Sequence, residues 1–150
     1  MVQMTPFSEI YTRFLSQTSS YELVSLDEEE LQEEFLPWLL SAIGYFTNCR
    51  KDLFKILDKD IEAFDETLDD MEIDILAKHM VHTYIGTYAI TEENIAQVLN
   101  SRDYRSYSPA NQLKVLLETQ SKVKSDADLL MSRYSYNVHI MRENEKKKKR

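Results

Sequence analysis

Glycine and proline are scarce in this sequence, which has two glycines and three prolines among its 150 residues. A chain built mainly of β-strands needs many tight turns, and these residue types supply most of them. Helical proteins need fewer turns, so the scarcity favours helices. The length is that of one ordinary domain, which can bury a hydrophobic core without disulfides or metals. We therefore expect an all-α fold, a compact bundle of several helices.

Cysteine is nearly absent, and no hydrophobic run is long enough to cross a membrane. Cys49 is the only cysteine, which excludes a disulfide within the chain and is typical of a reducing compartment. The most apolar stretch, Phe35 to Phe46, has about 12 residues, whereas a membrane span needs about 20. The first residues do not resemble a secretory signal peptide, which has a basic start and an apolar run. We expect a cytoplasmic protein without a membrane partner.

The sequence contains no recognisable motif for catalysis or cofactor binding. Two glycines are too few for a phosphate-binding loop or a nucleophile turn. His79 and His82 are three residues apart, but no further zinc ligands accompany them. The acidic stretch from Asp58 to Asp74 lacks the glycine and final glutamate of a calcium loop, so we interpret it as a solvated face. Cys49 has basic neighbours but no nearby histidine, which favours a structural thiol. We expect no enzyme, no metal and no cofactor.

Hydrophobic residues recur at helical spacing through most of the chain. Thr5 and Pro6 predict a helix start with Thr5 as the cap, and Ser25 with Glu28 has the spacing of a capping box. Pro37 predicts a kink or a restart within the second helix. The helical segments that we expect cover residues 6–15, 27–46, 53–64, 69–85 and 91–99, with Gly86 as the C-terminal cap of the fourth and a polar loop at 101–107.

The clearest predicted helix begins at Ser108 and Pro109. From there a stripe of residues follows the alternating three-and-four spacing of a heptad repeat, namely Leu113, Leu116, Gln120, Val123, Ala127, Leu130 and Tyr134. Gln120 and Ala127 make the stripe too weak for an isolated coiled coil. It therefore predicts packing within the domain or against another subunit. The residues that we expect to pack between subunits are Leu113, Leu116, Val123 and Leu130.

The hydrophobic period changes to two after this stripe. Four residues that favour strands alternate there with mostly polar neighbours, namely Tyr134, Tyr136, Val138 and Ile140. Because no other segment offers a partner strand, we expect pairing with another chain at the edge of a sheet. The alternative is a helix that frays into a basic tail. Residues 1–133 are thus predicted to form a helical domain, and residues 134–150 an extended C-terminal arm with a strand and a basic end.

Charge is distributed unevenly along the chain. The net charge is −8, but residues 142–150 hold six basic and two acidic residues, which leaves 12 basic (18 − 6) and 24 acidic (26 − 2) residues before them. The acidic body is repelled by nucleic acid, whereas the basic end is attracted to phosphates or to an acidic protein surface. The residues expected to dock to a partner are Arg142, Lys146, Lys147, Lys148, Lys149 and Arg150.

Four parts of the sequence carry a resemblance to a known family. They are Leu39 to Ile43 followed by Lys51 to Leu53, Ile73 to Ala77, Asp103 to Leu113, and Tyr134 to Tyr136. On these fragments the chain resembles the small virion proteins of tailed bacteriophages that connect the head to the tail. These are called head-to-tail connector, adaptor or neck proteins.

The resemblance implies a structural subunit of a ring, twelvefold in that family, in the neck of the virion. Such a homo-oligomer is assembled in the host cytoplasm and binds the portal protein on one side and a tail or stopper protein on the other. DNA passes through the ring during ejection without sequence-specific binding, and an acidic wall would keep the DNA from adhering. An extended C-terminal arm would grip the portal.

Two other classes of function stay open at this point. The first is a small phage or bacterial regulatory protein that binds nucleic acid or a host protein, which predicts a monomer or dimer with a mobile basic tail. The second is a helical enzyme with dispersed carboxylates, which predicts several buried acidic residues in one pocket.

Overall fold

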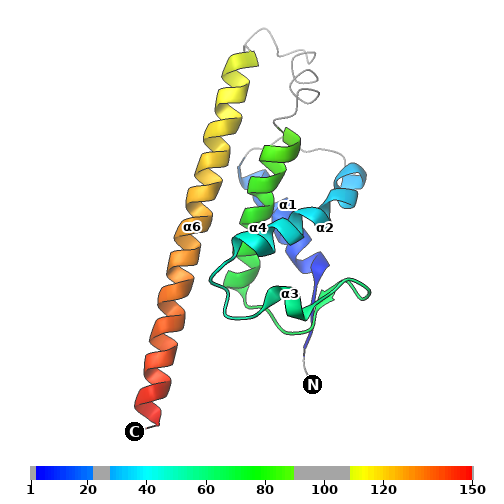
Figure 1. Ribbon diagram of the computed structural model, residues 1–150. Helices are drawn as coiled ribbons and strands as arrows, with labels where there is room; N and C mark the ends of the chain where they lie inside the picture. Colours follow the sequence, from blue (N-terminus) through cyan, green and yellow to red (C-terminus); the bar gives the residue numbers. More distant parts are fainter. Residues whose placement is uncertain (1–2, 22–27, 90–108, 150) are drawn as a thin grey trace.

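Three helices form a body, and a fourth, much longer helix lies along one side of it (Figure 1). The computed structural model describes residues 3–21, 28–89 and 109–149. The body helices are α1 (Phe7–Ser20), α2 (Glu28–Tyr45) and α4 (Asp70–Tyr84), and the long helix is α6 (Pro109–Lys148). Of the described residues 76% are helical, which confirms the predicted helical character and the long C-terminal helix.

Helix α4 is the centre of the fold, because α1, α2 and α6 all pack against it. Apolar side chains occupy several of its faces, and Ile75, Leu76 and Met80 are completely buried. Its start agrees with the prediction at Asp69 or Asp70. The Asp69 carboxylate accepts a hydrogen bond from the Glu72 N–H at 2.8 Å, and the Asp69 N–H donates to the Glu72 carboxylate at 2.9 Å. This capping box fixes the first turn of the central helix.

Aromatic rings fill the space between α1, α2 and α4. The Phe14 ring lies 5.6 Å from Phe35, 5.8 Å from Trp38 and 5.9 Å from Tyr84, measured between ring centroids. The contacts to Phe35 and Tyr84 are edge-to-face, the arrangement that the quadrupoles of aromatic rings favour. Phe14 therefore joins all three body helices.

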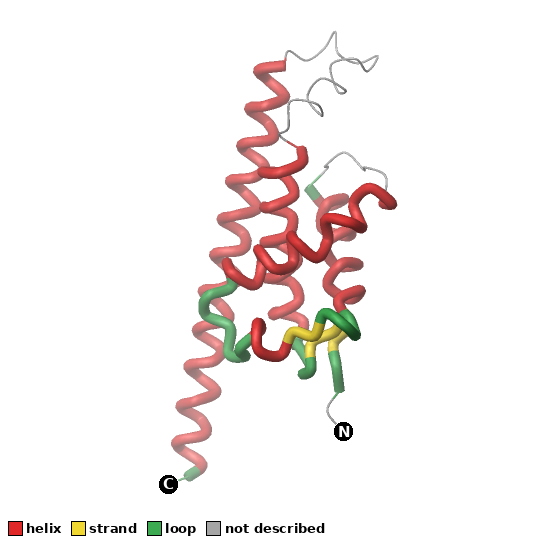
Figure 2. The backbone as a smooth tube through the Cα atoms, turned by 45° about the vertical axis from the view of Figure 1, so that its right-hand side comes forward, coloured by secondary structure: helices red, strands yellow, loops and turns green. Residues whose placement is uncertain are grey.

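A small three-stranded sheet replaces most of the helix predicted over residues 53–64. Helix α3 (Leu53–Ile56) ends after one turn, and β2 (Leu57–Asp58) and β3 (Ala63–Phe64) form a hairpin. Strand β1 (Thr5–Pro6) pairs antiparallel with the other side of β3, which gives the order β1-β3-β2 (Figure 2). Both pairs of strands, β1 with β3 and β2 with β3, lie within the residues described. The helix predicted over residues 53–64 is therefore wrong beyond Ile56, while the predominantly helical character of the fold is confirmed.

Local hydrogen bonds explain why the helix stops. The Asp58 carboxylate accepts from the N–H groups of Asp60 and Ile61 at 3.0 and 3.4 Å, which closes a turn that competes with the helix. Glu62 then adopts a φ of 51°, in the left-handed region. The chain reverses here instead of continuing for two more helical turns.

Thr5 does not cap the first helix, contrary to the prediction. Pro6 occupies the N-cap position and makes no capping hydrogen bond from its side chain. The Thr5 hydroxyl instead donates to the Glu66 carbonyl at 3.0 Å and accepts from the Leu68 N–H at 2.8 Å. Thr5 therefore joins the N-terminal strand to the segment that leads into α4.

The structure also shows what happens at Pro37 and at Gly86, the predicted kink or restart and the predicted C-terminal cap. Helix α2 continues through Pro37 as one element. Gly86 is not a C-terminal cap, because the chain continues after Tyr84 as a short π-helix, η1 (Ile85–Ala89). A Cβ at Gly86 would lie 2.7 Å from the side-chain amide nitrogen of Gln120 on α6, at the flexible end of that side chain. Ser25, the helix predicted over residues 91–99 and the loop at 101–107 lie outside the described residues.

The strand predicted around Tyr134 to Ile140 is wrong, because these residues lie within α6. The basic arm is helical as far as Lys148 rather than extended. Tyr134 and Val138 are four residues apart and both pack against the body, as neighbours on one helical face do. A pattern that repeats every two residues also repeats every four, so it fits both a strand and one face of a helix. Packing against the body stabilises the helix here. No helix among the described residues has the length and apolarity required to cross a membrane.

We expect Phe14→Ala to lower the free energy of unfolding by about 3–5 kcal/mol, because it removes a fully buried ring that touches three other rings. Urea denaturation followed by circular dichroism measures this. Phe54→Ala is the matched control, because Phe54 is exposed on α3 and should cost less than about 0.5 kcal/mol. Equal losses from the two substitutions would contradict the assigned core.

Candidate interaction surface on the long helix

The inner face of α6 packs against the body through part of the predicted heptad stripe. Val123, Ala127 and Tyr134 are buried, and Leu130 packs against the core at their side. Leu116 is half-buried, whereas the side chain of Leu113 is outside the described structure. Val123 and Leu130 therefore pack within their own chain and not, as predicted, between subunits. The heptad stripe is the seam between α6 and the body.

A buried carboxylate lies beneath this seam. Glu72 of α4 is 0% exposed, and the Lys51 ammonium, itself 17% exposed, lies 2.6 Å from its Oε1 atom. The Tyr134 hydroxyl donates to Oε2 of Glu72 at 2.9 Å, and the Asp69 N–H donates to Oε1. Each oxygen of the buried charge is therefore hydrogen-bonded, as burial of a charge requires.

Tyr134 connects α6 to two parts of the body at once. Besides donating to Glu72, its hydroxyl accepts from the Arg50 N–H at 2.8 Å. Its ring contacts Phe46 edge-to-face with centroids 5.2 Å apart. The side-chain amide of Asn48 adds bonds to the Met131 carbonyl and the Ser135 hydroxyl, at 2.9 and 2.6 Å. The segment after α2 is thereby fastened to the middle of α6.

The charges in this cluster stabilise the fold and do not activate the Cys49 thiol as a nucleophile. Burial acts to raise the pKa of Glu72, but the bonds from Lys51, Asp69 and Tyr134 outweigh it and hold the pKa below the ordinary value of 4.5. Burial, reinforced by the Glu72 charge, raises the pKa of the Cys49 thiol to about 11. The thiol is thus protonated at neutral pH and is a poor nucleophile, in agreement with the structural role predicted for Cys49.

The acidic stretch is a solvated face only in part. Asp60, Asp65 and Asp69 are exposed as predicted. Glu72 is buried, and Asp74 pairs with Arg13 of α1 and accepts from Gln17. Asp69 and Glu72 have capping-box spacing, a signal present in the sequence, but that signal gives no indication that Glu72 also receives Lys51.

The two histidines of α4 pack against aromatic and sulfur-containing side chains. His79 is buried and stacks on Tyr45 with ring centroids 5.5 Å apart, while its Nε2 lies 3.2 Å from the Met131 sulfur. His82 meets the same Tyr45 ring edge-to-face. No group of three or more histidine, cysteine, aspartate or glutamate side chains in the described parts of the chain could hold a metal ion.

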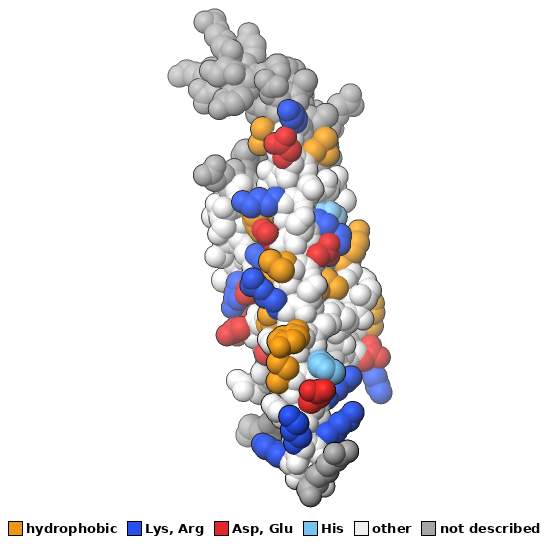
Figure 3. All heavy atoms as spheres, turned by 90° about the vertical axis from the view of Figure 1, so that its left-hand side faces the viewer, with side chains coloured by type: hydrophobic (Ala, Val, Ile, Leu, Met, Phe, Trp, Pro, Cys, Tyr) orange, Lys and Arg blue, Asp and Glu red, His pale blue; other side chains and the backbone are white. Residues whose placement is uncertain are grey.

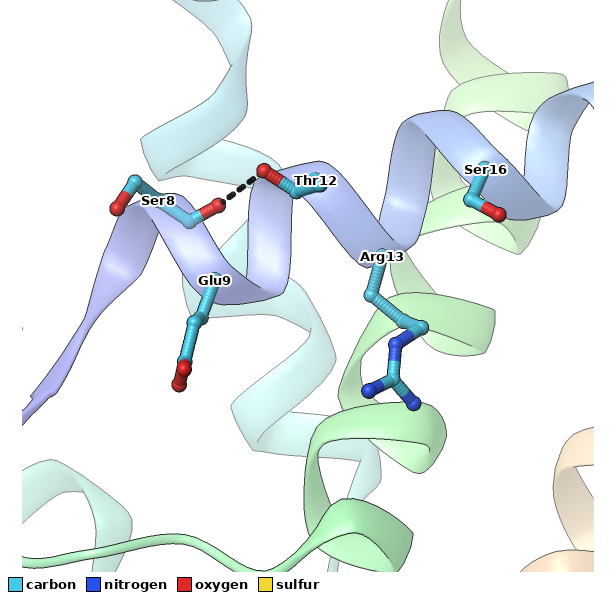
Figure 4. A pocket seen from close by; sticks show the side chains of 5 residues that line it. All are labelled: Ser8, Glu9, Thr12, Arg13 and Ser16. Carbon is cyan, nitrogen blue, oxygen red and sulfur yellow. Dashed lines mark hydrogen bonds between the residues drawn. The ribbon is translucent and has the colours of Figure 1, made fainter.

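A shallow depression lies on the outer side of α1, where one helix supplies all of its lining side chains (Figure 4). The Thr12 hydroxyl is satisfied by the Ser8 carbonyl at 2.8 Å. Arg13 points away toward α4, where it pairs with Asp70 and Asp74. Since all lining side chains come from one helix, and Thr12 and Arg13 are already bonded, the depression offers no convergent set of reactive groups.

The outer face of α6 carries side chains that nothing in the described body covers. Tyr136 is 64% exposed and Ile140 is 38% exposed, and Leu129 is exposed as well. Met141 is also exposed but lies toward the body, where its sulfur accepts a hydrogen bond from the Arg50 guanidinium at 3.9 Å. Apolar side chains are visible on this face, with basic side chains gathered at its C-terminal end (Figure 3). The basic residues there that the structure describes are Arg142, Lys146, Lys147, Lys148 and Lys149, all exposed, while Arg150 lies outside the description.

The helix divides the predicted partner-binding residues into two groups. Tyr134 is buried and Val138 is half-buried against the body, so both hold α6 in place. Tyr136 and Ile140 are exposed on the other side of the helix, and the four consecutive lysines, Lys146 to Lys149, are exposed around its end. Only this second group is available to a partner.

No protein-family model, curated protein or solved structure matches the chain.

We expect Glu72→Gln to lower the free energy of unfolding by about 3–5 kcal/mol, because it leaves the Lys51 ammonium without its counter-charge in a buried site. Tyr134→Phe should cost about 1–3 kcal/mol, because it leaves part of the hydrogen bonding unsatisfied. Urea titrations at pH 7 give both values. Asp128→Asn removes an exposed ion pair with Lys124 and should cost at most about 0.5 kcal/mol. Similar losses of unfolding free energy for all three variants would contradict a larger stabilising role for the buried cluster than for an exposed ion pair.

Acidification should destabilise the protein through His79. Burial lowers the pKa of His79 from 6.5 to about 4, so between these values the unfolded chain binds a proton that the folded chain does not. The free energy of unfolding should therefore fall by up to about 1.4 kcal/mol per pH unit as the pH decreases below 6.5. His79→Leu should reduce this slope, while His139→Gln, at an exposed position of α6, should keep it. An unchanged slope in His79→Leu would contradict the burial of a neutral imidazole.

Proposed function

We propose that this chain is a non-enzymatic structural subunit that assembles with other proteins through the exposed C-terminal end of α6. The observation that carries the proposal is that α6 extends past the lower edge of the body while its inner face is fastened at Tyr134 (Figure 1). A helix of 40 residues is about 60 Å long, more than twice the length of α4 with its 15 residues. The body therefore does not cover its last turns.

The physical argument is one of incomplete packing. The end of α6 exposes Tyr136, Ile140 and Met141, side chains that would be stabilised by leaving water. Most helical stability in proteins comes from packing of an apolar face, and the last turns of α6 receive none from the body. A protein partner would supply that packing. Aromatic side chains and arginine are enriched in protein interfaces, and Tyr136 and Arg142 are of these types.

We further propose that the assembly is the connector between the portal and the tail of a bacteriophage. The resemblance of the four sequence fragments supports this, and in this proposal the protein belongs to the neck of a virion assembled in the host cytoplasm. A ring of such subunits would bind the portal protein and a tail or stopper protein. Residues 1–141 carry twice as many acidic as basic residues, a charge that suits the wall of a DNA passage.

A regulatory protein that binds nucleic acid or a host protein is the second candidate. The run of exposed lysines from Lys146 to Lys149 favours it, because clustered cations bind phosphates. Its binding to DNA would decrease steeply with salt, whereas a connector needs no affinity for DNA. Titration of duplex DNA at two salt concentrations separates the two functions.

The test of the connector function is the mass of the purified protein, alone and mixed with the portal protein of the same genome, by light scattering on a sizing column. We expect a complex containing many copies of this chain. The double variant Tyr136→Ala with Ile140→Ser should weaken that complex at least tenfold, because both side chains lie on the exposed end of α6.

The matched control is Val115→Ser with Leu117→Ser, which changes two exposed apolar residues near the other end of the same helix. This control should assemble like the wild type. A wild-type chain that stays small in the presence of portal would contradict the connector function. Equal effects of the two double variants would contradict the assignment of binding to the end of α6.

A further inference from the structure

The exposed end of α6 combines apolar and basic side chains. We call this surface the basic end, and it consists of Tyr136, Ile140, Met141, Arg142 and Lys146 to Lys149. Between Arg142 and Lys149 there are five basic and two acidic residues. None of the four lysines forms an ion pair with any described residue of its own chain.

A second surface, around the β2–β3 hairpin, has the opposite charge. Residues 58–70 contain seven acidic residues and one lysine, and most of these carboxylates are exposed. Two large apolar side chains lie beside them, because Phe54 on α3 is 58% exposed and Ile61 in the hairpin is 52% exposed. We call Phe54, Ile61 and the acidic residues of this segment the acidic rim.

The two surfaces cannot satisfy each other within one chain. Helix α6 packs on α4 and η1, and the hairpin lies on the other side of the body in both Figure 1 and Figure 2. Of the described acidic residues from Asp58 to Asp69, none forms an ion pair. Each copy therefore presents a basic surface with apolar side chains on one flank and an acidic surface with apolar side chains on the other.

We propose that the basic end of α6 docks on the acidic rim of a second copy of this chain. The inference rests on the proposed function and names the partner of the surface assigned there. Two different surfaces meet in such a contact, so each copy keeps one of each free for the next copy. A head-to-tail contact of this kind produces a closed ring when its rotation closes, and a filament when it does not.

Charge and apolar contact have separate tasks in this interface. Exposed ion pairs contribute little affinity, but complementary charge selects and orients the partner. The affinity comes mainly from Tyr136 and Ile140 meeting Phe54 and Ile61. Because the opposed charges are exposed before contact, the association should weaken as salt screens them.

The experiment is a charge swap on the full chain, with mass measured by sedimentation equilibrium over a range of protein concentrations. The tail variant carries Lys146→Glu, Lys147→Glu, Lys148→Glu and Lys149→Glu. The rim variant carries Asp60→Lys, Asp65→Lys and Glu66→Lys, whose side chains are exposed and make no hydrogen bond within the described structure. Each variant alone should self-associate at least tenfold more weakly than the wild type, and an equimolar mixture should recover heterodimers within a few-fold of the wild-type affinity.

The matched control, Glu9→Lys with Glu33→Lys and Glu34→Lys, makes the same change of charge on exposed parts of α1 and α2. It should associate like the wild type. Association of the rim variant at wild-type strength, or a mixture of rim and tail variants that fails to recover, would overturn the inference. A wild-type chain that is monomeric alone, and whose portal complex is unaffected by the rim substitutions, overturns the inference but leaves the connector function standing. A chain that associates neither with itself nor with portal contradicts both.

Discussion

The contact between Glu72, Lys51 and Tyr134 is the interaction on which the placement of the long helix depends. A carboxylate removed from water must be paired and hydrogen-bonded, and the groups that satisfy it come from three parts of the chain. Glu72 lies in the first turn of the central helix, Lys51 belongs to the segment after α2, and Tyr134 belongs to α6. Hydrogen bonds have narrow ranges of distance and angle, so these contacts fix the rotation and the height of α6 against the body.

The surface available to a partner follows from that placement. With Tyr134 turned inward, Tyr136 and Ile140 turn outward, and the lysines at the end of the helix lie beyond the body. The hairpin after α3 places a group of carboxylates on the other flank. One chain therefore carries two different surfaces of opposite charge that are both partly apolar, and a head-to-tail contact joins two different surfaces.

Helical periodicity predicted the body helices and the long helix, because each has enough apolar positions to define one buried face. It failed over residues 57–64, where the Asp58 side chain closes a turn that the apolar spacing does not reveal. It failed again at residues 134–140, because a period of two contains the four-residue spacing that places Tyr134 and Val138 on one helical face. The helix separates Tyr134 and Val138, which pack against the body, from Tyr136 and Ile140, and the binding of a partner to the exposed residues stays a prediction. The burial of Glu72 could not be predicted, since its partners are distant in the sequence.

The most direct test of this account is amide hydrogen exchange of the free chain and of its assembly, resolved by peptide. The account predicts that residues 139–148 and 58–66 exchange more slowly in the assembly, while residues 123–134, already packed in the free chain, change little. Unchanged exchange at both the end of α6 and the hairpin, in an assembly shown to contain many copies, would contradict it.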